Sequence, residues 1–156
     1  MKNFDKFLDW ARDNNWIIEE AAESYKMPPE FAGKIPQWES TAVQYNIISN
    51  REETVFLVVG ESLRCEETEG QSFRWDTFKN ISLEASEGDE REAVTEWWKY
   101  HFPLLMIVSG EYEFYAADIR DGSVVNGAEP MFEETTKTAD SIEEFFEMIT
   151  NGEIIL

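Results

Sequence analysis

The longest unbroken apolar run in the chain, residues 102–108, predicts a central strand. The run is too short to span a membrane and about as long as a strand that is buried on both faces. We expect the side chains from Leu104 to Val108 to be buried on alternate faces of it. After a serine–glycine turn, residues 112–117 alternate and predict a half-buried partner strand. A third strand is expected at 124–125, after an aspartate–glycine turn.

Shorter patterns predict further strands on either side of this core. Residues 43–48 alternate and residues 54–59 are β-branched and aromatic, so the two segments should form a hairpin. The segments 72–75 and 78–83 are two more short strand candidates, and an edge strand is expected at 131–137.

Helical spacing of apolar residues predicts helices over 4–11, 18–25, 90–100 and 142–149. Asn3 is the expected N-cap of the first helix. The last helix opens with a capping box, in which the Ser141 hydroxyl accepts a hydrogen bond from the Glu144 amide and the Glu144 carboxylate reaches back. The three prolines of residues 28–38 predict a non-regular connection with, at most, one short turn of helix.

These elements together predict an α+β fold. The sheet should be mixed but mostly antiparallel, flanked by helices. With 156 residues, no internal repeat and no flexible linker, the chain is expected to be a single domain over 1–156.

Charge narrows the classes of partner. The chain has 33 acidic and 13 basic residues, a net charge of −20, so it should repel nucleic acid and an anionic membrane surface. A basic protein would be attracted. The same acidity also fits a protein that is merely kept in solution.

The sequence offers little catalytic chemistry. There is one histidine, His101, which we expect to be structural, and one cysteine, Cys65, in an acidic run that should keep its thiol protonated. Two such residues cannot close a zinc site, and no phosphate-binding glycine motif is present. We therefore predict no enzyme activity, no metal and no cofactor. A lone cysteine and an N-terminus without an apolar leader favour the cytoplasm.

Two acidic runs, each near a tryptophan in the sequence, are the candidates for partner binding. Acids steer a cationic partner, and tryptophan often anchors an interface, although core packing is its more common role. Trp97 and Trp98 are adjacent on a predicted helix, so one should pack on the sheet and the other be partly exposed. The predicted partner-binding residues are Glu66, Glu67, Glu69, Trp75, Glu87, Asp89, Glu90 and Trp98.

The second half of the chain resembles the SUKH superfamily, which includes yeast cell-wall-synthesis regulators and many bacterial toxin-immunity proteins. The resemblance rests on the apolar run 102–108, the segment 110–118, the turn and strand at 122–125 and the helix start at 140–146. It implies an α+β domain without catalysis. It further implies a bacterial immunity-type protein that binds and neutralises a basic toxin, often a nuclease. The alternative is a regulatory scaffold or a small-ligand-sensing domain, as in other members.

Overall fold

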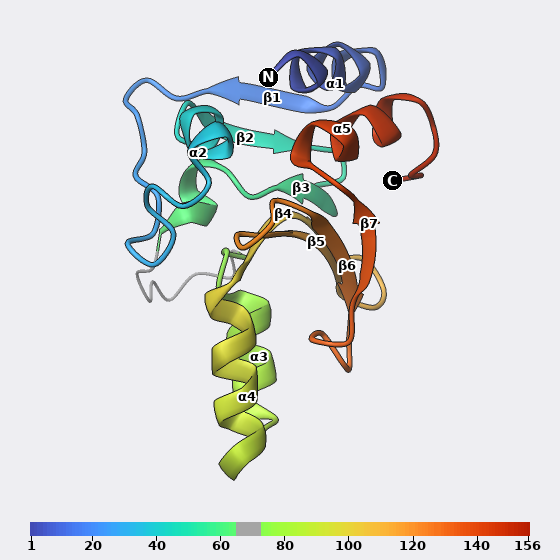
Figure 1. Ribbon diagram of the computed structural model, residues 1–156. Helices are drawn as coiled ribbons and strands as arrows, with labels where there is room; N and C mark the ends of the chain where they lie inside the picture. Colours follow the sequence, from blue (N-terminus) through green and yellow to red (C-terminus); the bar gives the residue numbers. More distant parts are fainter. Residues whose placement is uncertain (65–72) are drawn as a thin grey trace.

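The apolar run 102–108 forms most of strand β4 (His101–Ile107), the central strand of a seven-stranded sheet (Figure 1). The computed structural model describes residues 1–64 and 73–156. Strand β4 pairs with β3 (Val55–Leu57) on one side and β5 (Glu113–Asp118) on the other. Leu104, Leu105 and Met106 are fully buried, as predicted.

The sheet follows the chain in strict order from β1 to β7, and each described pairing is antiparallel. The α+β prediction is thus confirmed, with a sheet that is antiparallel throughout the described residues. The remaining strands are β1 (Ile17–Glu20), β2 (Tyr45–Ser49), β6 (Val124–Ala128) and β7 (Thr136–Ala139). The predicted hairpin is β2 and β3, and the predicted third strand is β6.

Helices cover the two faces of the sheet separately, and neighbouring residues of β5 show which helices lie on which face. The Tyr115 ring lies 5.1 Å from that of Phe145, in α5 (Ile142–Thr150), whereas Phe114 contacts Phe78 and Trp98 on the opposite face. The first face also carries α1 (Lys2–Asp13) and α2 (Pro36–Ala42). The second carries α3 (Thr77–Glu84) and α4 (Gly88–Lys99).

Aromatic rings fill the core on the first face. Phe4 and Phe7 project from α1 onto Phe146 of α5, with ring centroids 5.0 and 5.1 Å away. Trp38 of α2 stacks on the same Phe146 ring at 5.6 Å. The helices α1, α2 and α5 are therefore joined through one aromatic cluster.

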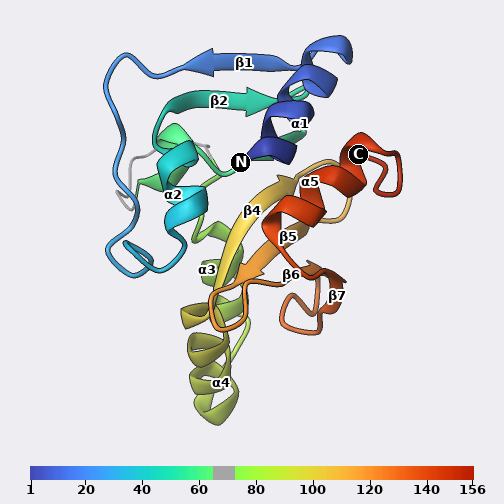
Figure 2. The ribbon, with the colours of Figure 1, turned by 45° about the horizontal axis from the view of Figure 1, so that its top comes forward.

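On the second face, α3 and α4 form a hairpin that extends beyond the sheet (Figures 1 and 2). We call this hairpin, residues 77–99, the helical arm. Its tip, residues 84–92, comprises the turn between the helices and the helical residues on either side of it, and its base is where α4 runs into β4. Near the base, Phe78 and Trp98 are buried in the core, while at the tip residues 84–85 and 87–92 are exposed and Ser86 is buried.

Three sequence predictions are wrong about the type of element. Residues 18–25 are not a helix, because Ile17 and Ile18 pair with β2 as part of strand β1. Residues 78–83 belong to helix α3 rather than a strand, since Phe78 and Ser82, one helical turn apart, are both buried on its inner side. Of the other strand candidate, 72–75, residues 73–75 are not in a strand and residue 72 lies outside the described residues.

Other boundaries need correction. The non-regular connection predicted from the prolines of 28–38 is interrupted by helix α2. Pro36 is the first residue of this helix, a position where a missing backbone N–H costs nothing. Met1, not Asn3, is the N-cap of α1, and the Asn3 amide instead donates to the Glu143 carbonyl at 3.1 Å. The expected edge strand at 131–137 is displaced to β7. Ile107 and Val108 are half-buried rather than buried.

The capping box of α5 is confirmed. The Ser141 hydroxyl accepts from the Glu144 amide at 3.1 Å. The Glu144 carboxylate reaches back to the amide of Asp140, at 2.6 Å, one residue earlier than a standard capping box would have it.

Candidate functional site

The tip of the helical arm carries one of the two acidic runs predicted from the sequence. Glu87, Asp89 and Glu90 are all exposed there. Glu84 and Glu92, which the sequence analysis did not select, flank them and are exposed as well. The tip therefore carries five acids. The other predicted run, Glu66, Glu67 and Glu69, lies outside the described residues.

No cation neutralises these five acids among the residues the structure describes. None of the ion pairs found there involves Glu84, Glu87, Asp89, Glu90 or Glu92. The one basic residue at the tip, Arg91, turns its guanidinium back onto the Leu83 carbonyl, at 2.6 Å. The tip is consequently a negative surface, with five acids against one arginine.

The predicted aromatic anchors lie elsewhere, in the core. Trp75 and Trp98 are 3% and 2% exposed, so neither ring projects from the surface as an interface anchor. Trp98 donates from Nε1 to the Glu133 carboxylate at 2.8 Å, and the Ser82 hydroxyl donates to the same carboxylate at 2.8 Å. This clasp ties both helices of the arm to the loop after β6.

Of the tryptophan pair, Trp98 packs on the sheet side and Trp97 is partly exposed, as the adjacent positions predicted. Trp97 stacks almost parallel on His101, with ring centroids 3.8 Å apart. The half-exposed ring, which the list of partner-binding residues omitted, is thus held against the base of the arm.

His101 is structural in its geometry. Because the Trp97 carbonyl can only accept, the Nδ1–H of His101 donates to it at 2.7 Å, and Nε2 lies 3.4 Å from the Asp118 carboxylate. Burial lowers the pKa of His101, and the Trp97 carbonyl and Asp118 oppose part of that shift. Hydrogen bonds from Arg120 in turn lower the pKa of Asp118. Nδ1 therefore has an acceptor in either protonation state, whereas Nε2 can donate to Asp118 only when the ring is protonated.

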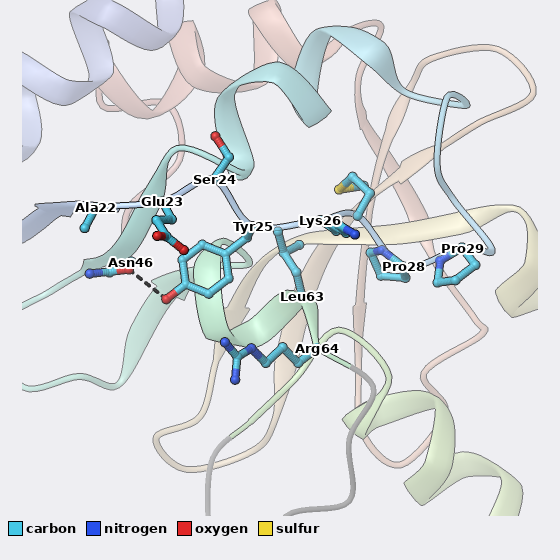
Figure 3. A pocket seen from close by; sticks show the side chains of 11 residues that line it. Ala22, Glu23, Ser24, Tyr25, Lys26, Pro28, Pro29, Asn46, Leu63 and Arg64 are labelled. Atoms are coloured by element: carbon cyan, nitrogen blue, oxygen red, sulfur yellow. Dashed lines mark hydrogen bonds between the residues drawn. The ribbon is translucent and has the colours of Figure 1, made fainter.

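A cleft of about 740 Å³ lies between the connection after β1, strand β2 and the 3₁₀ helix η1 (Gly60–Leu63) (Figure 3). Tyr25 crosses it and donates to Asn46 Oδ1 at 2.7 Å. The Asn46 amide donates to Glu19 at 2.8 Å. The guanidinium of Arg64 lies 5.6 Å from the Tyr25 ring centre. No sequence pattern pointed to this site apart from the two prolines on its wall, Pro28 and Pro29.

The cleft is fixed by a close backbone approach. Gly60 has φ +58°, and a Cβ there would come within 2.4 Å of the Asn46 carbonyl oxygen, so a side chain cannot fit. Burial raises the pKa of Tyr25, with Glu61 adding to the shift, which keeps the phenol neutral. The Tyr25 hydroxyl also lies within hydrogen-bond distance of Glu61 Oε1, at 3.2 Å, so the phenol is held between acceptors on β2 and on η1.

Trp75 and Trp98 do meet at a smaller pocket, of about 300 Å³, at the base of the arm. Its lining holds Lys34, Lys79 and Lys99 and only one acid, Glu30. The two predicted tryptophans are thus brought together, but among lysines rather than beside the predicted acids.

Within the described residues, no group of three or more histidine, cysteine or acidic side chains is arranged to hold a metal ion. No helix there is long and apolar enough to cross a membrane. Comparisons with models of known protein families, with curated proteins and with solved structures give no match for this chain.

Proposed function

We propose that this protein is a non-catalytic binding domain of the immunity type, which binds and neutralises a basic toxin domain in the cytoplasm. The tip of the helical arm is the contact surface. The observation that carries the proposal is the set of five exposed acids at the tip, none of which has an ion-pair partner among the described residues.

Helix stabilisation accounts for only part of this acidity. Asp89 and Glu90 lie in the first turn of α4, where the helix dipole favours negative charge. Glu84 is the last residue of α3, where the dipole disfavours it, and Glu92 lies beyond the first turn of α4. Because Glu84 is exposed at the tip although the α3 dipole disfavours an acid there, helix stabilisation does not explain this acid, and a role in recognition is supported.

An acidic projection suits inhibition of a basic nuclease in particular. Proteins that act on nucleic acid hold the phosphates with lysine and arginine, and these cations are the natural partners of the tip carboxylates. Acids paired with those cations would exclude the phosphates. The resemblance to SUKH immunity proteins, drawn from other residues, supports the same class of partner.

Long-range charge should act mainly on the association rate. Complementary charges steer the encounter, and their effect weakens as the Debye length falls below about 8 Å above physiological salt. Packed contacts at the interface set the dissociation rate and are screened much less.

The test begins with the basic protein that co-purifies with this chain from its source cells, followed by binding kinetics with the two purified proteins. The tip variant replaces Glu84, Glu87, Glu90 and Glu92 by glutamine. The control variant replaces Glu52, Glu111, Glu134 and Glu153, all exposed elsewhere, by glutamine, and so removes the same charge.

We expect the tip variant to associate at least about tenfold more slowly than the control, and to inhibit the partner's toxicity less. Equal slowing in both variants would mean that only net charge matters and would remove the tip from the proposal. A rate that neither variant nor salt changes would contradict an electrostatic interface altogether.

A further inference from the structure

The pocket at the base of the arm differs in charge from the protein around it. Three of the seven lysines in the chain line this one volume of about 300 Å³. They come from three separate segments: Lys34 from the turn before α2, Lys79 from α3 and Lys99 from the end of α4. In a chain with a net charge of −20, this is a local concentration of positive charge.

Two of these lysines are available to a ligand. Lys99 is paired with Glu96 at 3.0 Å, whereas Lys34 and Lys79 have no ion-pair partner in the described part of the chain. The Lys79 ammonium lies 5.8 Å from the Trp75 ring centre, close enough for a cation–π contact that holds it on the lining. Glu30, the acid on the lining, leaves an excess of positive charge.

The rest of the lining is aromatic, from Phe31, Trp75, Trp98 and Tyr100. The first three of these side chains are at most 3% exposed and Tyr100 is half-buried, so core packing holds the aromatic part of the lining in place. An aromatic lining and two ammonium groups without ion-pair partners in the described part of the chain suit an aromatic ring with an anionic group.

The volume sets the size of that molecule. About 300 Å³ is at the lower end of the range for small-molecule sites, so a single ring with one anionic substituent is the natural occupant. We propose that this pocket binds a small aromatic anion, a carboxylate or a phosphate monoester, with the ring among the four aromatic side chains and the anionic group on Lys34 and Lys79. The site is separate from the acidic tip and does not depend on the partner proposed above.

Titrations with phenyl phosphate and benzoate test this proposal, with binding measured by calorimetry and by tryptophan fluorescence. The buffer contains about 0.15 M salt, which largely screens long-range repulsion between the anions and the acidic protein. Benzyl alcohol and benzylamine supply the same ring without charge and with the opposite charge, and inorganic phosphate supplies the anion without the ring. We expect saturable binding of at least one of the two aromatic anions, at least about tenfold tighter than any of the other three probes.

The variant Lys34→Gln with Lys79→Gln should weaken that binding at least about tenfold. The control, Lys2→Gln with Lys6→Gln, makes the same change in net charge at two exposed residues of α1 and should leave it unchanged. Urea midpoints would establish that both variants fold. Absence of saturable binding for both aromatic anions, or an equal loss in the two variants, would overturn the proposal.

Discussion

The tip and the base of the helical arm belong to the same two helices but differ in almost every physical property. At the tip, acids such as Glu84, Glu87 and Glu92 are exposed and have no ion-pair partner among the described residues. At the base, Trp98 is 2% exposed, its ring contacts those of Trp97 and Phe114, and its N–H donates to Glu133. One end is therefore open to the outside, and the other is fixed in the core.

The difference separates stability from recognition within one hairpin. Large stability effects come from buried groups whose loss leaves a cavity or an unpaired polar atom, and surface charges contribute little. Substitutions at the base should consequently change the free energy of unfolding, whereas substitutions at the tip should change binding alone. The following variants test that division, beginning with the largest expected effect.

Trp98→Ala should cost about 3–5 kcal/mol of unfolding free energy, because it removes a large side chain that is only 2% exposed and leaves the Glu133 carboxylate without one of its donors. Urea titration at neutral pH measures the loss. Trp97→Ala, on the adjacent half-exposed residue, is the matched comparison and should cost clearly less. If Trp98→Ala lowers the unfolding free energy no more than Trp97→Ala does, the buried contacts of Trp98 at the base do not stabilise the arm.

Glu133→Gln should cost about 1–3 kcal/mol, since the carboxylate accepts from both Ser82 and Trp98 and an amide can offer only one acceptor oxygen. Glu134→Gln, on the exposed neighbour, should change the unfolding free energy by less than about 0.5 kcal/mol. Equal effects from the two variants would mean that the clasp between the arm and the loop after β6 adds no stability.

Sequence patterns predicted the parts of the fold that are decided locally. The run 102–108 became β4 because an unbroken apolar segment bounded by turn residues has few alternatives. The α5 capping box was readable because its hydrogen bonds join residues a few positions apart. Residues 18–25 were misassigned because β1 exists through pairing with β2, a contact that no local pattern reveals.

The candidate sites were less predictable, for a related reason. The exposed acids at 87–90 could be selected because a charged run next to a glycine is seldom buried. Trp75 and Trp98 could not be assigned to a surface, since tryptophan is common both in cores and at interfaces. Lys34, Lys79 and Lys99 are brought together only by the folded chain, from three segments that have no shared pattern.

The base of the arm should also respond to pH through His101. Burial lowers its pKa from the ordinary value of 6.5, so below that pH the unfolded chain binds a proton that the folded protein resists. The stability that His101 contributes is therefore present above about pH 6.5 and is lost as the pH falls through the lowered pKa. The pKa of Asp118 is also lowered, by its hydrogen bonds from Arg120, so the stability that Asp118 contributes is lost in a separate pH range, below 3.8.

Urea titrations between pH 7.5 and 5 measure this dependence. His101→Asn keeps an N–H that can reach the Trp97 carbonyl but does not titrate, so its unfolding free energy should change less over that range than that of the parent. The same slope in the parent and in His101→Asn would assign the pH dependence to other groups.

The smallest effect is expected at the tip. The variant with Glu84, Glu87, Glu90 and Glu92 replaced by glutamine should differ from the parent by less than about 0.5 kcal/mol in unfolding free energy. Relief of repulsion among the acids stabilises the variant, and the loss of Glu90 from the first turn of α4 costs part of that gain. Any difference should shrink in 1 M salt, where the Debye length is about 3 Å. A loss above about 1 kcal/mol would mean that the acids hold the arm together. Their exposure would then have a structural explanation, and the proposed interface would lose the observation on which it rests.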